Sequence, residues 1–108
     1  MANVLGIGGF IFRARDPDAL GKWYQTHLGV EYDNFVWQQQ AGPTVHRPFP
    51  EDSDYFAQDK AFMINFRVAD LDALCADLTA AGIDVQTDPS WNTAEYGRFA
   101  RIHDPEGT

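Results

Sequence analysis

The sequence predicts an α+β domain built from two similar halves. The first observation is an internal repeat, since DPDAL at positions 16–20 recurs 54 residues later as DLDAL at positions 70–74. The second is that each copy follows an apolar, strand-like segment and begins a helical pattern. The third is the length of 108 residues, which is the size of one domain. We therefore predict a single domain over residues 1–108, with one module at about 4–57 and a second at about 61–108.

The first predicted element of each module is a strand, at residues 5–13 and at residues 62–68. Both segments are rich in Ile, Phe and Val, which favour strands. In the second segment Phe62, Ile64 and Phe66 alternate with more polar residues, so one face of the strand is apolar.

The second predicted element of each module is a helix that begins after an aspartate. Asp16 is a good N-cap, Pro17 suits the first helical position, and Gly29 ends the first helix. Asp70 begins the second helix and Gly82 ends it.

Short strands and turns are predicted after each helix. They are separated by a Pro- and Asp-rich linker at 48–60 and by a loop at 87–95. The predicted strands are at residues 30–32, 35–39, 44–49, 83–86 and 96–103. The sequence then stops at the turn motif Asp104-Pro-Glu-Gly-Thr108, so we expect the last strand of the second module to be missing, through truncation or because it comes from elsewhere.

Composition excludes several function classes. The chain has 8 basic and 16 acidic residues, a net charge of -8, and no basic cluster, which disfavours binding to nucleic acid or to an anionic membrane. No apolar run approaches the ~20 residues of a spanning helix. The single cysteine, Cys75, cannot form an internal disulfide, and its place on the predicted helix makes it a packing residue. We expect a cytoplasmic protein.

The duplicated module, the Asp-capped helix ending in His-Leu-Gly and the Asp-Pro-x-Gly turn together resemble the vicinal oxygen chelate superfamily. Glyoxalase I, bleomycin-resistance proteins and extradiol dioxygenases belong to it. The resemblance covers Leu5 to Thr108. It implies two βαβββ modules whose strands form a curled sheet cup, with the helices outside.

The resemblance also implies a metal ligand on the first strand of each module, seven residues before the capping aspartate. Those positions hold Gly9 and Met63. Glycine has no side chain and a thioether prefers soft ions, so neither suits a divalent cation. We therefore expect a metal-independent protein, without a cofactor, that binds a small molecule in an aromatic-lined cup. Whether it is also an enzyme stays open, although the residues at positions 9 and 63 argue against it. Two alternatives remain open: a metal-dependent lyase or dioxygenase with a non-standard ligand set, and a structural or regulatory module whose cup is filled by its own side chains.

Nine residues are expected to line or rim the cup. Guanidinium groups suit carboxylates, although in an acidic chain they also form surface ion pairs. Aromatic rings suit a planar ligand, although they also form ordinary core. The predicted ligand-binding residues are Arg13, Arg67, Trp37, His46, Phe49, Asn65, Trp91, Tyr96 and Arg98.

His46 is the one weak catalytic candidate, acting with Tyr96 or Arg98. The three histidines, His27, His46 and His103, show no metal-ligand spacing. The ligand's charge stays open, because the acidic balance favours a cation and the arginines favour an anion. We also expect a homodimer, formed at a sheet edge that the missing strand leaves exposed.

Overall fold

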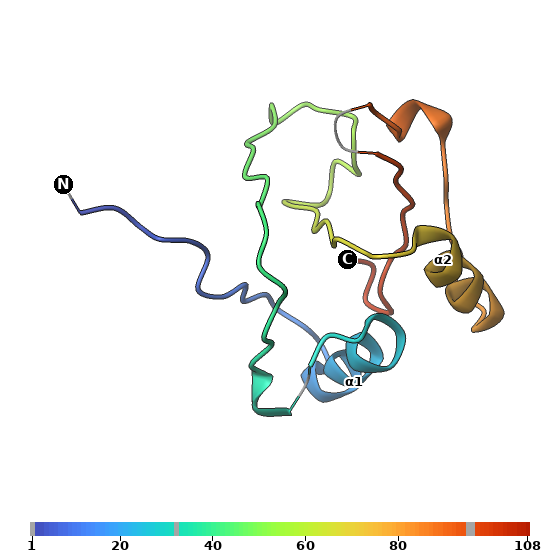
Figure 1. Ribbon diagram of the computed structural model, residues 1–108, viewed down its shortest axis with the longest axis horizontal. Helices are drawn as coiled ribbons and strands as arrows, with labels where there is room; N and C mark the ends of the chain where they lie inside the picture. Colours follow the sequence, from blue (N-terminus) through green and yellow to red (C-terminus); the bar gives the residue numbers. More distant parts are fainter. Residues whose placement is uncertain (1, 32, 95–96) are drawn as a thin grey trace.

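The computed structural model describes residues 2–31, 33–94 and 97–108 (Figure 1). Two α-helices, α1 (Pro17–Leu28) and α2 (Leu71–Ala80), are its main regular elements. Two short 3₁₀ helices are η1 (Asp33–Phe35) and η2 (Pro89–Trp91). The remaining chain runs in extended and turn conformations that join these helices, and the N-terminal segment projects away from the rest (Figure 1).

Helix α1 begins and ends where the sequence predicts. The Asp16 carboxylate accepts a hydrogen bond from the Ala19 amide at 3.1 Å, which satisfies one of the free N–H groups of the first turn. Pro17 is the first helical residue. Gly29 then adopts a left-handed conformation with φ 69°, and its amide donates to the Gln25 carbonyl at 3.2 Å.

Helix α2 follows the same rules. Asp70 accepts from the Ala73 amide at 3.0 Å, and Gly82, with φ 81°, follows the helix C-cap. Leu78 of α2 and Leu20 of α1 are the buried apolar residues of the described chain, at 4% and 5% exposure. The two predicted helices are therefore confirmed, and each contributes one residue to a small core.

The predicted sheet cup is wrong. Within the described residues the chain forms no β-strand, and its β-pairing consists of two isolated antiparallel bridges, Gln86 with Arg101 and Thr93 with Gly97. The segments at 5–13 and 62–68 are not paired as strands, and the later strand predictions fail in the same way where the chain is described.

The physical reason lies in the backbone. A strand is stable only when its N–H and C=O groups pair with a neighbouring strand, and alternating apolar residues supply no such partner by themselves. Leu5 and Ile11 are 104% and 91% exposed, so these side chains of the first predicted strand are open to solvent, whereas the Phe10 ring lies 5.1 Å from that of Phe62. Without a sheet, the described residues form no cup interior.

The predicted turn at 104–108 forms and folds back beside α1. One oxygen of the Asp104 carboxylate accepts from the amides of Glu106 (2.9 Å) and Thr108 (3.0 Å). The other accepts from the Tyr24 hydroxyl at 2.7 Å. Asp104 is only 5% exposed, and this burial is tolerated because both carboxylate oxygens have donors.

Glu106 fastens the same turn to the start of α1. Its carboxylate accepts from the backbone amides of Arg15 (2.6 Å) and Asp16 (3.0 Å), and these hydrogen bonds lower the pKa of Glu106. Tyr24 lies on α1 and contacts the same turn. Burial and the hydrogen bond to Asp104 raise the pKa of Tyr24 well above its ordinary value. The two acids of the turn thus hold together residues that lie 80 to 91 positions apart in the chain.

Candidate functional site

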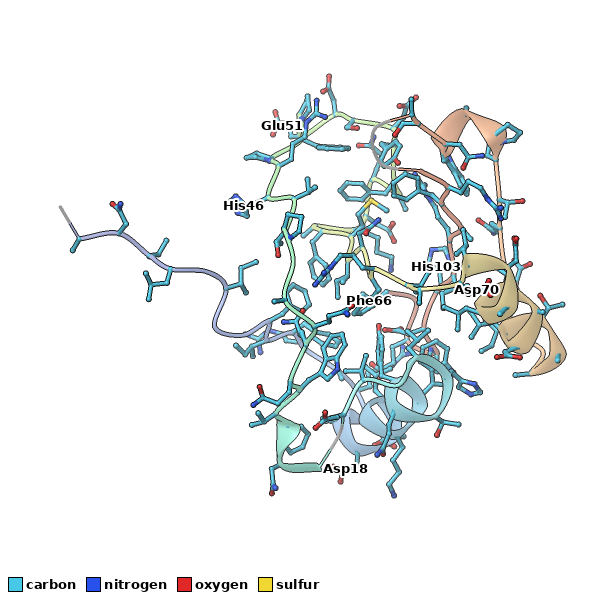
Figure 2. All side chains as sticks on the ribbon, in the orientation of Figure 1. Asp18, His46, Glu51, Phe66, Asp70 and His103 are labelled. Carbon is cyan, nitrogen blue, oxygen red and sulfur yellow. The ribbon has the colours of Figure 1, made fainter. Side chains whose placement is uncertain are left out.

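A cavity of about 480 Å³ lies within the loop between the two helices, at residues 47–63. Its wall combines apolar rings, one thioether and several charged or polar side chains. Figure 2 labels Glu51 on this loop and His46 just before it. The cavity is lined by Arg47, Pro48, Phe49, Pro50, Glu51, Ser53, Phe56, Ala57, Gln58, Lys60, Ala61, Phe62 and Met63.

Phe49 is the centre of an aromatic cluster on the cavity wall. Its ring centroid lies 5.5 Å from that of Tyr55 and 6.1 Å from that of Phe56, both in tilted geometry. These separations are typical of favourable aromatic pairs. Phe49 keeps 38% of its surface exposed, so part of the ring is available to a ligand. Of the predicted site residues, Phe49 is one that lines this cavity.

The charged groups at the cavity give it a positive balance. Arg47 and Lys60 line it together with one acid, Glu51. The Arg47 guanidinium carbon lies 5.4 Å from the centre of the Phe49 ring, within range of a cation–π contact. Lys60 also lies 3.9 Å from the Asp59 carboxylate, an exposed ion pair of the kind that contributes little. The lining of the cavity thus carries two basic groups and one acid, although the loop as a whole also holds Asp52, Asp54 and Asp59.

The arginines expected at the site make other contacts. Arg67 donates from Nη2 to the Gln40 carbonyl at 2.7 Å and from Nη1 to the Ala41 carbonyl at 3.4 Å. Gly42 leaves the space for it, since any side chain there would overlap the guanidinium. Arg98 forms a two-pronged ion pair with Asp72, which lowers the pKa of that carboxyl.

The other predicted site residues are spread over the molecule. Trp37 packs against Phe66 at 6.1 Å between centroids. His46 is exposed and points away from the body of the molecule (Figure 2). Arg13 and Asn65 are also exposed. Tyr96 lies outside the described residues. The structure thus does not bring the eight described residues of the predicted set together at one place.

The sequence gives no sign of the part that Arg101 plays. Its guanidinium carbon lies 4.2 Å from the centre of the Trp91 ring and 4.4 Å from that of Tyr55, so the cation is held between two aromatic rings. Its Nη1 donates to the Tyr55 carbonyl at 2.7 Å, and its buried Nη2 has no hydrogen-bond partner among the described residues. Its backbone also pairs with Gln86 at 2.8 Å. Because Tyr55 and Trp91 are far apart in the chain, no local pattern could have predicted this contact.

A second cavity, of about 420 Å³, lies beside the start of α1 and is lined by the 104–108 turn. Asp16, Glu106 and Arg15 are its charged groups. Asp16 already caps α1, and Glu106 already accepts two backbone hydrogen bonds. Its polar groups are therefore occupied in holding the fold together.

The residues present do not fit a divalent metal at the positions that the resemblance implies. Met63 lies on the cavity wall with 40% exposure, and its sulfur is a soft ligand. Gly9 offers no donor atom from a side chain. Across the described ranges, no three side chains of the His, Cys, Asp and Glu types are grouped so that they could hold an ion.

Comparison with known proteins assigns the family. A family model described as a glyoxalase-like domain matches residues 9–108. No curated protein and no solved structure matches the chain. Among the described residues, neither helix is long and apolar enough to cross a membrane. The chain belongs to the glyoxalase-like domain family, in agreement with its resemblance to the vicinal oxygen chelate superfamily.

Proposed function

We propose that this glyoxalase-like domain binds a small molecule that carries an apolar or planar part and an anionic group, without a metal ion. The observation that carries the proposal is the cavity at residues 47–63, where three phenylalanines and a methionine meet two basic side chains. A volume of about 480 Å³ is within the usual range of small-molecule sites.

The apolar wall supplies contact area for the ligand. Phe49, Phe56 and Phe62 are stiff side chains that lose little conformational freedom when a ligand covers them. Met63 adds a flexible, polarisable surface that adapts to an irregular ligand. That residue stands where the wider superfamily has a metal ligand, so in this chain the position supplies apolar contact instead of coordination.

The basic side chains set the preferred ligand charge. Arg47 offers a planar set of N–H donors that matches a carboxylate, and Lys60 adds a second positive charge. Both outweigh Glu51 in the lining, so an anion gains more from this cavity than a cation of the same shape. Our proposal therefore favours an anionic ligand, a choice that the overall composition of the chain leaves open.

Two probes of matched size test the proposal: 2-naphthoate, an anion, and 2-naphthylmethylammonium, a cation. We expect isothermal titration calorimetry to detect 2-naphthoate binding and to find the cation at least about 10-fold weaker, because one opposed charge contact changes the binding free energy by about 1.4 kcal/mol or more. The affinity should be the same with and without EDTA. Binding that requires Zn²⁺, Ni²⁺, Mn²⁺ or Fe²⁺ would refute the proposal in favour of a metal-dependent enzyme.

A matched pair of variants locates the site. Phe49→Leu removes a ring from the cavity wall and should weaken 2-naphthoate binding about 3- to 10-fold, the equivalent of roughly 0.5–1.5 kcal/mol for an aromatic pair. Phe66→Leu makes the same chemical change at a residue of similar exposure, 36% against 38%, that does not line the cavity. Equal weakening by both variants, or by neither, would contradict the assignment of this cavity.

A further inference from the structure

The loop that forms the cavity, residues 47–63, makes most of its hydrogen bonds within itself. The Tyr55 amide donates to the Ser53 hydroxyl at 3.2 Å, and the Gln58 side chain donates to the Ser53 carbonyl at 2.7 Å. Between described residues, a single hydrogen bond joins this loop to the rest of the chain, from Arg101 Nη1 to the Tyr55 carbonyl at 2.7 Å. The polar attachment of the loop therefore depends on Arg101.

Arg101 is itself held in place by its surroundings. Its backbone N–H and C=O both pair with Gln86 at 2.8 Å. Its guanidinium lies between the rings of Trp91 and Tyr55, at 4.2 and 4.4 Å from their centres. Trp91 ends η2, a short helix capped by the Asp88 carboxylate. The planar guanidinium is thus fixed on a folded platform and directs its donor at one point of the loop.

Tyr55 carries this contact to the wall of the cavity. Its ring centroid lies 5.5 Å from that of Phe49, and its neighbour in the chain is Phe56. Both phenylalanines line the cavity, whereas Tyr55, Trp91 and Arg101 do not. Arg101 therefore acts on the aromatic wall through Tyr55 and not on a ligand directly.

We infer that Arg101 is a positioning residue for ligand binding, which fixes the aromatic wall of the cavity through Tyr55. The inference rests on the function proposed above. Without the contact from Arg101, the ligand itself has to order the Phe49 and Phe56 rings, and ordering side chains on binding reduces affinity. The expected loss for 2-naphthoate is about 10-fold, although the altered residue lies outside the cavity.

The first test is calorimetric titration of Arg101→Met with 2-naphthoate, which should bind about 10-fold more weakly than to the wild type. Tyr24→Phe is the matched control, because it also removes a hydrogen bond between distant parts of the chain, to Asp104, at a residue that does not line the cavity. Both variants are compared at a temperature where circular dichroism shows them folded. The control should bind within about 2-fold of the wild type.

Two further measurements separate position from charge, because Arg101→Met also removes a positive charge. Arg101→Lys keeps that charge and a donor for the Tyr55 carbonyl but has no planar group to stack, so its loss should be smaller, about 3-fold. Raising NaCl from about 0.05 M to about 0.5 M screens distant charges and should leave the ratio between the wild type and Arg101→Met unchanged. A loss that disappears at high salt would overturn the inference.

The last measurement needs no ligand. The ¹⁵N heteronuclear NOE of residues 53–58 should fall in Arg101→Met, because the loop is released, and should keep its wild-type values in Tyr24→Phe. Unchanged values in Arg101→Met, or equal loss of affinity in Tyr24→Phe, would overturn the inference. If the wild type binds 2-naphthoate and both Arg101 variants bind it equally well, the inference alone fails. If the wild type does not bind it, the proposed function fails and the inference fails with it.

Discussion

Replacing Tyr24 with phenylalanine removes a single hydroxyl group from the contact between α1 and the turn at 104–108. That hydroxyl donates to the Asp104 carboxylate at 2.7 Å, and the acceptor oxygen has no other protein donor among the described residues. Asp104 is 5% exposed, so in the variant the oxygen is left largely without water as well. The substitution therefore tests how much this single hydrogen bond stabilises the fold.

The expected magnitude follows from the charge and burial of the pair. A hydrogen bond to a charged group contributes about 1.5–3 kcal/mol. Tyr24 is half-buried, which places the expected loss near the middle of that range, at about 2 kcal/mol. For a domain of this size, each kcal/mol corresponds to roughly 4–8 °C, so the melting temperature should fall by about 8 °C or more.

Urea denaturation followed by circular dichroism at 222 nm measures the change in the free energy of unfolding. Tyr55→Phe is the matched control, because Tyr55 is 40% exposed and its ring, not its hydroxyl, makes the contacts with Phe49 and Arg101. A loss below about 0.5 kcal/mol for Tyr24→Phe, or an equal loss for Tyr55→Phe, would refute the reasoning.

The pH dependence of stability provides a second test of the hydrogen bond between Tyr24 and Asp104. Because the pKa of Tyr24 is raised in the folded state, its contribution is complete below the ordinary tyrosine value of 10.0. It is lost as the pH rises above 10, when the unfolded chain begins to ionise. The stability difference between the wild type and Tyr24→Phe should therefore be constant at neutral pH and shrink in alkali.

Two further predictions concern acid stability and the stacked arginine. The pKa of Glu106 is lowered by its hydrogen bonds from the Arg15 and Asp16 amides, so its contribution to folding stability is present above the ordinary value of 4.5 and is lost as the pH falls. Between pH 5 and pH 3, Glu106→Gln should therefore lose less stability than the wild type in urea titrations. The control variant Glu31→Gln should behave like the wild type. Arg101→Met should lower the free energy of unfolding by about 2 kcal/mol, because it removes two cation–π contacts and one hydrogen bond, and a loss within error of zero in chemical denaturation would contradict the stacked arrangement.

The helices could be predicted from the sequence because their signals are local. Asp16 and Asp70 each bond an amide three residues ahead, so the N-cap and its partner lie within a single turn. Gly29 ends α1 in a left-handed backbone conformation, which glycine adopts readily because it has no side chain to clash.

The strands could not be predicted with the same security because pairing is not local. The apolar alternation at 62–68 reports a tendency toward an extended chain, and the segment carries no helix. Whether an extended segment becomes a strand depends on a second segment at hydrogen-bonding distance, and the pattern of one segment holds no information about the other. The internal repeat indicated the family correctly and the sheet incorrectly.

The candidate site could be predicted only in part, because most of its contacts join residues that are far apart in the chain. Phe49 lies between Pro48 and Pro50 in the loop, and the structure places it on the cavity wall. Arg67 instead donates to the carbonyls of Gln40 and Ala41, and Arg98 pairs with Asp72. These partners lie 26 or 27 residues away in the chain. The terminal turn was recognised by its residues, but its position against Tyr24 depends on a contact across 80 residues.

The stacked arginine has a consequence for how binding can be observed. Phe49 on the cavity wall touches Tyr55, Tyr55 touches Arg101, and Arg101 touches Trp91. A continuous row of rings and one cation therefore joins the cavity to an indole. We expect a ligand that displaces Phe49 to shift the positive charge beside that indole. The emission of Trp91, one of three tryptophans in the chain, should then change when the cavity is filled.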